Sequence, residues 1–331
     1  MSDKKCVIAL VIRPDHPVVA KIPKDIPVEF IVGNDLSTFT NHQLFSQVEA
    51  VTWIPDGLPG VQVLDDLYQS LPSVKWIHAY SAGVDVIAPF IRERLLNSPT
   101  VLTNGRSAFS SSLAEYVMAM ALHFNKQVVR CQENKAQHKW EKYVMPVLKG
   151  KTMCFVGFGS IAQATAKIAK DGFGMKVLAV RRNVTKDDTG LAAEIFSNEE
   201  RLAAIEKSDF VVCSLPGTSE TLNFMGVEEF SAMSRDAYFI SVGRGAAVDE
   251  EALVEALNSD KIAGAALDVY KKEPLPTDHA LWDTKNLVMT SHNADYTEDY
   301  FDLGWDVWRK NFEAFSNKTE WFTPVDKSSG Y

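Results

Sequence analysis

The turn after residue 156 carries the clearest chemical signal in the chain. It reads Gly-Phe-Gly-Ser-Ile-Ala, directly after an apolar run and directly before a helical pattern. In that setting the two glycines allow a tight turn and a close approach of the backbone to a pyrophosphate, and the alanine lets helix and strand pack closely. The helix N-terminus offers the phosphates free N–H groups and partial positive charge. The pattern predicts dinucleotide binding by Gly157, Phe158, Gly159, Ser160 and Ile161.

The end of the next predicted strand bears on which dinucleotide is used. An NAD site places an Asp or Glu about 20 residues after the glycines, where it binds the ribose hydroxyls. This chain has Arg181 and Arg182 there instead. Guanidinium groups suit a 2′-phosphate, so we predict a preference for NADPH, with NADH as a possible second cofactor. Two alternatives stay open: both arginines are solvated, or Asp187 and Asp188 curl back to the ribose.

Three further stretches with reactive side chains each follow a predicted strand. They contain Arg244, Glu273 and His292, in that order. The carboxyl ends of parallel strands form the edge at which open α/β sheets bind ligands. Taken singly, each residue also fits a surface loop, a solvated turn or a structural histidine. The stretches are Ser241-Val-Gly-Arg-Gly, Asp268-Val-Tyr-Lys-Lys-Glu-Pro-Leu-Pro and Ser291-His-Asn-Ala-Asp.

Together these stretches resemble the D-2-hydroxyacid dehydrogenase family, in its glyoxylate/hydroxypyruvate reductase branch. The resemblance covers nearly the whole chain in the family's order. It implies an α/β fold of two Rossmann-like, doubly wound parallel-sheet domains with a cleft between them. Further matches are Ala79-Tyr-Ser-Ala-Gly-Val-Asp, Thr103-Asn, Leu113-Ala-Glu, Leu215-Pro-Gly-Thr-Ser-Glu-Thr and Pro324-Val-Asp-Lys.

The resemblance implies that Arg244 binds substrate, His292 is the catalytic acid/base and Glu273 is its partner. The chemistry suits these residue types. A guanidinium binds planar carboxylate oxygens through two parallel hydrogen bonds. Histidine titrates in the range needed to protonate a carbonyl oxygen that gains charge, and a carboxylate on its other ring nitrogen fixes the tautomer and favours the charged ring. We expect no metal, since the arginine and imidazolium already polarise the carbonyl.

Other residues carry over from the family by position. The backbone amides of Ala82 and Gly83 are similar to those that hold the substrate carboxylate, and Asp268 matches a contact to the nicotinamide carboxamide. Trp140 matches a tryptophan that approaches the active site of the partner subunit, and a core or interface role for it stays open. Further cofactor contacts are expected from Leu215, Pro216, Thr221, Val242 and Gly243.

The resemblance implies an NAD(P)H-dependent oxidoreductase that reduces small 2-keto acids to D-2-hydroxy acids. Glyoxylate or hydroxypyruvate is the expected substrate. The alternative is a nucleotide-sensing interaction protein on the same fold, similar to the C-terminal-binding-protein corepressors. It predicts tight cofactor binding with little turnover.

The elements that must position these residues alternate along the chain. Short apolar runs alternate with helical patterns, which predicts crossover connections and parallel sheets covered on both faces. The pattern occurs twice. We predict a substrate-binding domain of residues 1–104 plus 296–331 and a dinucleotide-binding domain of residues 105–295. Predicted strands are 7–12, 28–32, 50–54, 74–78, 100–103, 152–156, 176–180, 210–215, 238–242, 264–269 and 287–290.

Composition bounds the class of protein and its surroundings. The 331 residues are 46% hydrophobic and 23% charged, typical of a globular chain, and the net charge of -9 disfavours nucleic-acid and anionic-membrane partners. The four cysteines show no C-x-x-C spacing, and no apolar stretch is long enough to span a bilayer, so we expect a cytoplasmic protein. Residues 112–140 resemble the family's dimerisation arm, so we predict a homodimer.

Overall fold

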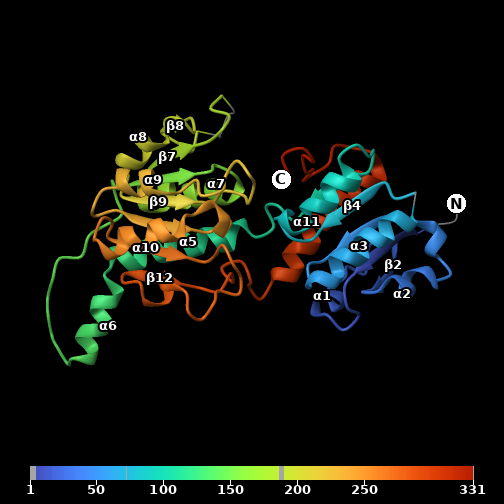
Figure 1. The fold of residues 1–331 in the computed structure, drawn as a ribbon, viewed down its shortest axis with the longest axis horizontal. Coiled ribbons are helices and arrows are strands. Elements are labelled where there is room, and N and C mark those ends of the chain that lie inside the picture. Colours follow the sequence, from blue (N-terminus) through green and yellow to red (C-terminus); the bar gives the residue numbers. More distant parts are fainter. Residues whose placement is uncertain (1–4, 72, 186–189, 331) are drawn as a thin grey trace. The chain divides into compact units, whose positions relative to one another are not determined.

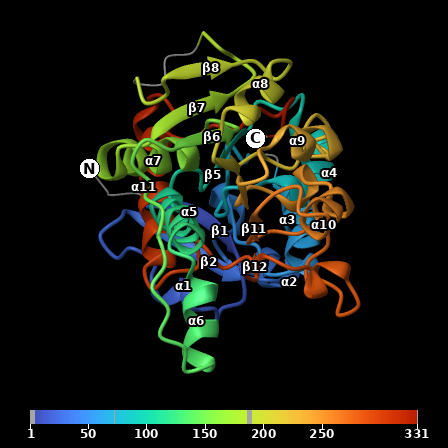
Figure 2. The same ribbon diagram turned by 90° about the vertical axis from the view of Figure 1, so that its left-hand side faces the viewer.

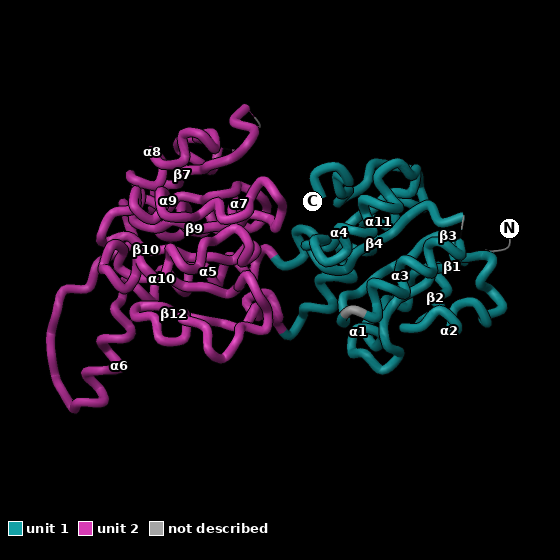
Figure 3. The backbone as a smooth tube through the Cα atoms, in the orientation of Figure 1, with its two compact units in different colours: residues 1–109, 298–331 teal, residues 110–297 magenta. Residues whose placement is uncertain are grey.

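The computed structural model describes residues 5–71, 73–185 and 190–330. The chain forms two compact units (Figure 3). Unit 1 combines Met1–Phe109 with Glu298–Tyr331, and unit 2 is Ser110–Thr297. The limits predicted from the sequence are residues 104 and 296. Unit 1 is therefore built from both ends of the chain, and unit 2 is inserted between them.

Unit 1 is organised around one parallel sheet with the strand order β2-β1-β3-β4-β5 (Figure 1). Its strands are β1 (Cys6–Val11), β2 (Val28–Gly33), β3 (Val48–Trp53), β4 (Trp76–Ala79) and β5 (Val101–Asn104). Its helices are α1 (Pro17–Ala20), α2 (Leu36–Thr40), α3 (Leu58–Ser70), α4 (Ala88–Phe90) and α11 (Tyr300–Asn317), with 3₁₀ turns at Phe45–Gln47 and Asp85–Ile87 and a π turn at Ile91–Leu95.

Both faces of the sheet in unit 1 are buried. Successive strand residues point to opposite faces, so a strand covered on both sides must be apolar throughout. On β1, Ala9 lies in the cluster that contains Leu64 of α3, and Leu10 lies in the cluster that contains Trp305 and Trp308 of α11. Helix α11 thus brings the C-terminal part of the chain onto the sheet formed by its N-terminal part.

Unit 2 is organised around a larger parallel sheet with the order β12-β11-β10-β9-β6-β7-β8. Its strands are β6 (Thr152–Val156), β7 (Lys176–Val180), β8 (Glu194–Phe196), β9 (Phe210–Cys213), β10 (Tyr238–Ser241), β11 (Gly264–Leu267) and β12 (Leu287–Met289). Its helices are α5 (Ser110–Asn125), α6 (Val128–Ala136), α7 (Ser160–Lys167), α8 (Arg201–Glu206), α9 (Val227–Ala232) and α10 (Glu250–Asn258), with a π turn at Ile168–Gly172 and 3₁₀ turns at Gly245–Ala247 and Ala280–Asp283.

Helices cover both faces of this sheet, with α5 and α7 on one side and α8, α9 and α10 on the other (Figure 2). Ala162 of α7 is fully buried, and Phe124 of α5 stacks on Tyr238 of β10 with ring centroids 4.6 Å apart. The fold class predicted from the sequence, two parallel-sheet α/β units, is confirmed. The prediction missed β8, a three-residue edge strand on β7, because its sequence Glu-Ile-Phe is not an apolar run, unlike the equally short edge strand β12, Leu-Val-Met.

The strand order determines where a ligand can reach unit 2. From β6 the chain adds β7 and β8 on one side of the sheet and then β9 to β12 on the other. In open α/β sheets, ligands bind beyond the carboxyl ends of the strands where the order reverses. The loops that follow β6, β9, β10 and β12 carry most of the residues singled out in the sequence.

Candidate active site

The turn after β6 has the conformation that a dinucleotide requires. Gly157 has a φ of +87°, in the left-handed region that favours glycine, and its N–H donates to the Val180 carbonyl at 3.0 Å. Gly159 lies directly before α7, and a Cβ placed on it would meet nothing within 4 Å. The helix N-terminus is therefore open, and its first N–H groups lack intrahelical partners. These residues fit the pyrophosphate of a nicotinamide dinucleotide.

The two arginines that we predict to bind a 2′-phosphate directly follow β7. The Arg181 N–H donates to the Phe196 carbonyl of β8 at 3.0 Å, so the missed strand fixes the backbone at this point. Arg182 is exposed and lies 2.9 Å from the Glu220 carboxylate. An exposed ion pair of this kind contributes little to stability, so a phosphate dianion can replace it. Asp187 and Asp188 are outside the described residues.

The loop after β9 is held in shape by Thr221. Its hydroxyl donates to the Pro216 carbonyl at 2.6 Å and accepts the Thr218 N–H at 3.0 Å. Leu215 lies against the phosphate-binding turn, since its Cδ2 is 3.0 Å from a Cβ built on Gly157. The loop therefore borders the same edge of the sheet as the turn after β6.

The stretches after β11 and β12 meet in a hydrogen-bonded pair. His292 Nδ1 lies 2.6 Å from Glu273 Oε2, and Glu273 Oε1 accepts the Tyr270 N–H at 2.9 Å. The hydrogen bond to Glu273 raises the pKa of His292 above its usual value, although burial opposes the shift. Burial raises the pKa of Glu273, but the hydrogen bonds from His292 and Tyr270 outweigh it and the net shift is downward. Because Nδ1 is engaged by Glu273, Nε2 is the ring nitrogen that remains for another partner.

Asp268 fixes the backbone that carries His292. Its carboxylate is buried and accepts hydrogen bonds from the Thr290 hydroxyl at 2.6 Å and the Asn293 N–H at 3.1 Å, while its carbonyl accepts the His292 N–H at 2.8 Å. His292 has a φ of +51°, a conformation that non-glycine residues adopt only when neighbours impose it. Asp268 thus has a positioning role that sequence reasoning did not assign; its predicted contact to the nicotinamide stays a prediction.

Arg244 follows β10 and belongs to the same electrostatic group. Its charge lowers the pKa of both Glu273 and His292, and its Nη1 donates to the Gly243 carbonyl at 3.0 Å. The next residue, Gly245, packs directly on the backbone of Tyr270, and a Cβ there would overlap it. The close contact joins the loop after β10 to the segment that leads to Glu273. Arginine, histidine and carboxylate are therefore brought together within unit 2.

The predicted substrate amides lie in unit 1, in the turn after β4. The Ala82 carbonyl accepts from the Asn104 side chain at 2.7 Å, and the Gly83 carbonyl accepts from the Ser81 hydroxyl at 2.7 Å. The carbonyls are thus held by the turn itself. This arrangement fits the prediction that the backbone N–H groups of Ala82 and Gly83 bind a carboxylate.

The chain is similar in sequence to a known family of dehydrogenases and to several reductases. Residues 118–294 match the model of the D-isomer specific 2-hydroxyacid dehydrogenase, NAD binding domain. The chain is 35% identical to a glyoxylate reductase of Thermofilum pendens over 243 residues, covering 70% of this chain and 69% of the relative. It is 33% identical to a glyoxylate/hydroxypyruvate reductase B of an Enterobacter species over 239 residues, covering 70% and 72%.

The chain belongs to the D-isomer-specific 2-hydroxyacid dehydrogenase family. A solved structure of a probable 2-hydroxyacid dehydrogenase from Rhizobium etli, in complex with NADP, HEPES and L(+)-tartaric acid, superposes with a TM-score of 0.80 at 25% identity over 99% of this chain and 100% of that one. The family resemblance inferred from the sequence is thereby confirmed. The region that matches the NAD-binding model lies inside unit 2.

Sequence reasoning assigned no role to one charged residue that interacts with His292. Asp295 lies three residues after His292 and is half-buried. Burial raises the pKa of its carboxyl group, while the charges of His292 and Arg244 act in the opposite direction. The signal was visible in the quoted stretch Ser291-His-Asn-Ala-Asp, but an acid beside a histidine is common on surfaces and drew no role.

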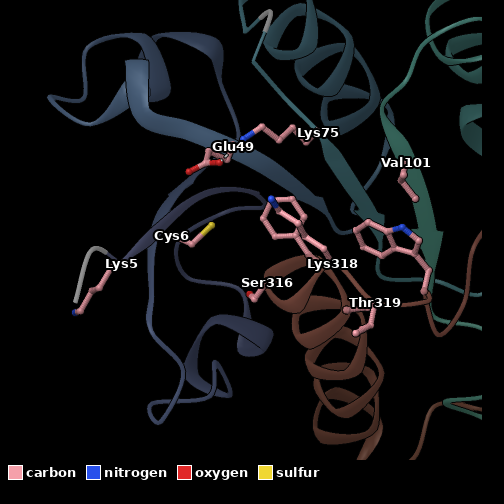
Figure 4. Close-up of a pocket in the computed structure, with 11 residues that line it drawn as sticks. Lys5, Cys6, Glu49, Lys75, Val101, Ser316, Lys318 and Thr319 are labelled. Atoms are coloured by element: carbon pink, nitrogen blue, oxygen red, sulfur yellow. Dashed lines mark hydrogen bonds and ion pairs between the residues drawn. The ribbon is translucent and has the colours of Figure 1, made fainter. Parts of the chain in front are cut away.

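A cavity of about 570 Å³ lies elsewhere, in unit 1 of the dehydrogenase. It opens at the amino ends of β1 and β5 and beside the end of α11 (Figure 4). Of the lysines that line it, Lys75 pairs with Glu49 at 2.6 Å and Lys5 pairs with Glu29 at 3.5 Å. None of the residues predicted to bind cofactor or substrate is among those that line this cavity.

Among the described residues of the dehydrogenase, a metal-binding cluster and a membrane-spanning helix are both absent. Across residues 5–71, 73–185 and 190–330, no group of three or more His, Cys, Asp or Glu side chains is arranged to hold a metal ion. Within the same residues, no helix has the length and apolar character to cross a membrane.

Proposed function

We propose that the protein reduces small 2-keto acids, such as glyoxylate or hydroxypyruvate, to D-2-hydroxy acids with hydride from NAD(P)H. The observation that carries the proposal is the Glu273–His292 pair, at 2.6 Å, within the electrostatic reach of Arg244. The relatives from Thermofilum and Enterobacter are named as reductases of glyoxylate or of glyoxylate and hydroxypyruvate. Their names supply the substrate class, and the residues supply the chemistry.

The three residues divide the work of the reaction. Arg244 binds the substrate carboxylate and the adjacent carbonyl oxygen through its planar guanidinium. A reduced nicotinamide dinucleotide whose pyrophosphate is held by the turn after β6 would supply the hydride to the carbonyl carbon, and the carbon–oxygen π electrons would move onto oxygen. His292 Nε2 gives its proton to that oxygen, and Glu273 at Nδ1 stabilises the charged ring beforehand. The sum consumes one keto acid, one NAD(P)H and one proton.

The direct test is a steady-state assay of NADPH oxidation with a panel of 2-keto acids. We expect turnover with glyoxylate, hydroxypyruvate or both. Tight binding of the reduced cofactor without turnover of any keto acid would contradict the proposal. That outcome would favour the alternative of a nucleotide-sensing interaction protein.

We further propose that NADPH is preferred over NADH. Arg181 and Arg182 follow β7, and Arg182 has an exposed carboxylate partner, Glu220, that a 2′-phosphate can displace. Charge-assisted hydrogen bonds contribute about 1.5–3 kcal/mol each, so discrimination should be on the order of 10- to 100-fold or more. The measurement is the ratio of kcat/KM for the two cofactors in the wild type, Arg181→Ala and Arg182→Ala. Equal efficiency or a preference for NADH in the wild type would contradict this reading of the loop.

A homodimer remains part of the proposal. The arm that contains α6 extends from the rest of unit 2 (Figure 1), and Trp140, Val144 and Val147 beyond it are exposed. Apolar side chains in such numbers on one segment are typical of an interface. Sedimentation equilibrium should give twice the chain mass of 36.8 kDa, and a monomer at micromolar concentration would contradict the dimer.

A further inference from the structure

The carboxylate of Asp295 has a fixed place beside the catalytic histidine. Asp295 lies on the loop after β12, three residues beyond His292. The buried Asp268 carboxylate accepts the N–H groups of Asn293 at 3.1 Å and Ala294 at 3.2 Å, so the backbone between the two residues is anchored. The Asp295 carbonyl in turn accepts the Thr297 N–H at 3.0 Å. The loop therefore cannot carry Asp295 away from the site without breaking these bonds.

The hydrogen-bonding capacity of the Asp295 carboxylate is only partly filled. Across the described residues 5–71, 73–185 and 190–330, no other residue donates a hydrogen bond to it or forms an ion pair with it. Its charge nevertheless acts on His292 and feels that of Arg244. Its own backbone N–H donates to it. A half-buried carboxylate with so few donors is costly, and a ligand that brings a further donor recovers part of that cost. Asp295 therefore lies within electrostatic reach of His292 and Arg244, with acceptor capacity to spare.

We propose that Asp295 accepts a hydrogen bond from the side chain of the 2-keto acid, and so selects substrates with a donor group beyond the carbonyl carbon. The inference rests on the proposed function. Once the substrate carboxylate and carbonyl are bound by Arg244 and His292, only the carbon chain beyond the carbonyl remains to be recognised. A hydroxyl or a cationic group there supplies the donor, whereas a second carboxylate meets the negative charge of Asp295.

The experiment compares kcat/KM for hydroxypyruvate and pyruvate, which differ by one hydroxyl. A lost hydrogen bond to a charged group corresponds to about 10- to 100-fold in rate, so the ratio of the two should fall by that factor in Asp295→Ala. In Asp295→Asn, kcat/KM for oxaloacetate should rise relative to kcat/KM for pyruvate, because the charge that repels the second carboxylate is removed. A 2-keto acid with a guanidinium side chain tests whether the preferred donor is a cation or a hydroxyl. If Asp295→Asn lowers kcat/KM for this substrate by a larger factor than kcat/KM for hydroxypyruvate, the preferred donor is cationic.

Ratios of kcat/KM between substrates are insensitive to a folding defect, because such a defect would lower turnover of all substrates alike. Glu298→Gln, which removes one negative charge from an exposed side chain three residues further on, is the matched control and should leave the ratios at wild-type values. Glyoxylate has no side chain, so its reduction tests the proposed function separately from the role of Asp295. If the wild type reduces no keto acid, glyoxylate included, the proposed function fails. If it reduces glyoxylate but the hydroxypyruvate-to-pyruvate ratio is the same in all variants, only the role of Asp295 fails.

Discussion

His78 in unit 1 lies on a strand of a parallel sheet and His292 in unit 2 lies shortly beyond one, but the two histidines have opposite surroundings. His78 lies on β4, fully buried, with Nδ1 2.8 Å from the Thr103 hydroxyl, and burial lowers its pKa to about 3. His292 lies in the loop after β12, and the hydrogen bond to Glu273 raises its pKa. The difference between an apolar interior and one carboxylate decides whether an imidazole is a neutral core residue or a proton donor.

The loops around these two histidines differ in the same way. At the carboxyl end of the unit 1 sheet, neutral groups bond to each other: the Asn104 amide to the Ala82 carbonyl, and the Tyr80 hydroxyl to the Phe301 carbonyl. At the carboxyl end of the unit 2 sheet, charged side chains gather instead. At the unit 1 edge these hydrogen bonds join neutral groups, whereas the unit 2 edge carries an arginine, a histidine and carboxylates.

The largest expected effect comes from removing the charged imidazole. His292→Ala should lower kcat for keto-acid reduction by about 100-fold or more, the low end for general acid–base catalysis. His78 is the internal comparison, because its substitution should act on folding rather than on the chemical step. The measurement is kcat at saturating NADPH and glyoxylate. A His292→Ala enzyme with near wild-type kcat would break the comparison.

Arg244→Ala should reduce both substrate binding and turnover. Its guanidinium meets the carboxylate in the ground state and the developing oxyanion in the transition state. Since charge-assisted hydrogen bonds are worth about 1.5–3 kcal/mol each, kcat/KM should fall by at least about 10-fold. Separate measurement of kcat and KM tests the assignment. An increase in KM alone would limit Arg244 to ground-state binding.

His78 should make stability depend on pH in a predictable direction. Its folded pKa lies near 3, below the usual 6.5, so the unfolded chain binds this proton first as the pH falls. Stability is then fully present above pH 6.5 and is lost progressively toward pH 3, by about 1.4 kcal/mol per pH unit at most. Urea unfolding of the wild type and His78→Leu between pH 4 and 7 isolates this contribution. Parallel stability curves for the two proteins would contradict it.

The smallest effect is expected in the pH profile of Glu273→Gln. The charged imidazole is the acid in reduction, so activity falls as the pH rises through the pKa of His292. Glu273 raises that pKa, and its neutral substitute should bring the fall to lower pH. The base form is needed for oxidation, so oxidation should begin at lower pH as well. A wild-type profile in both directions would remove Glu273 from the mechanism.

Local patterns were enough to predict most of the sheet. Runs such as 152–156 and 176–180 are strands because parallel strands buried on both faces must be apolar, and the limits observed for β6 and β7 are those predicted. Strand β8 escaped prediction because its sequence, Glu-Ile-Phe, begins with a charged residue and is not an apolar run. Strand β12, at the other edge and equally short, is apolar throughout and was predicted. Only the pairing of β8 with β7 in the assembled sheet identifies it as a strand.

The sequence by itself determined the fold class, the phosphate-binding turn and the residue types of the Arg244, Glu273 and His292 group, because each depends on spacing or on a side chain's own chemistry. The tertiary structure decided what surrounds them. It placed Glu273 at 2.6 Å from His292, turned Asp268 toward the loop, and left the Asp295 carboxylate without a donor from any other described residue. The pKa of a side chain, and whether its acceptor atoms are used, depend on the distances and burial of residues far apart in the chain. Only folding sets these distances and this burial.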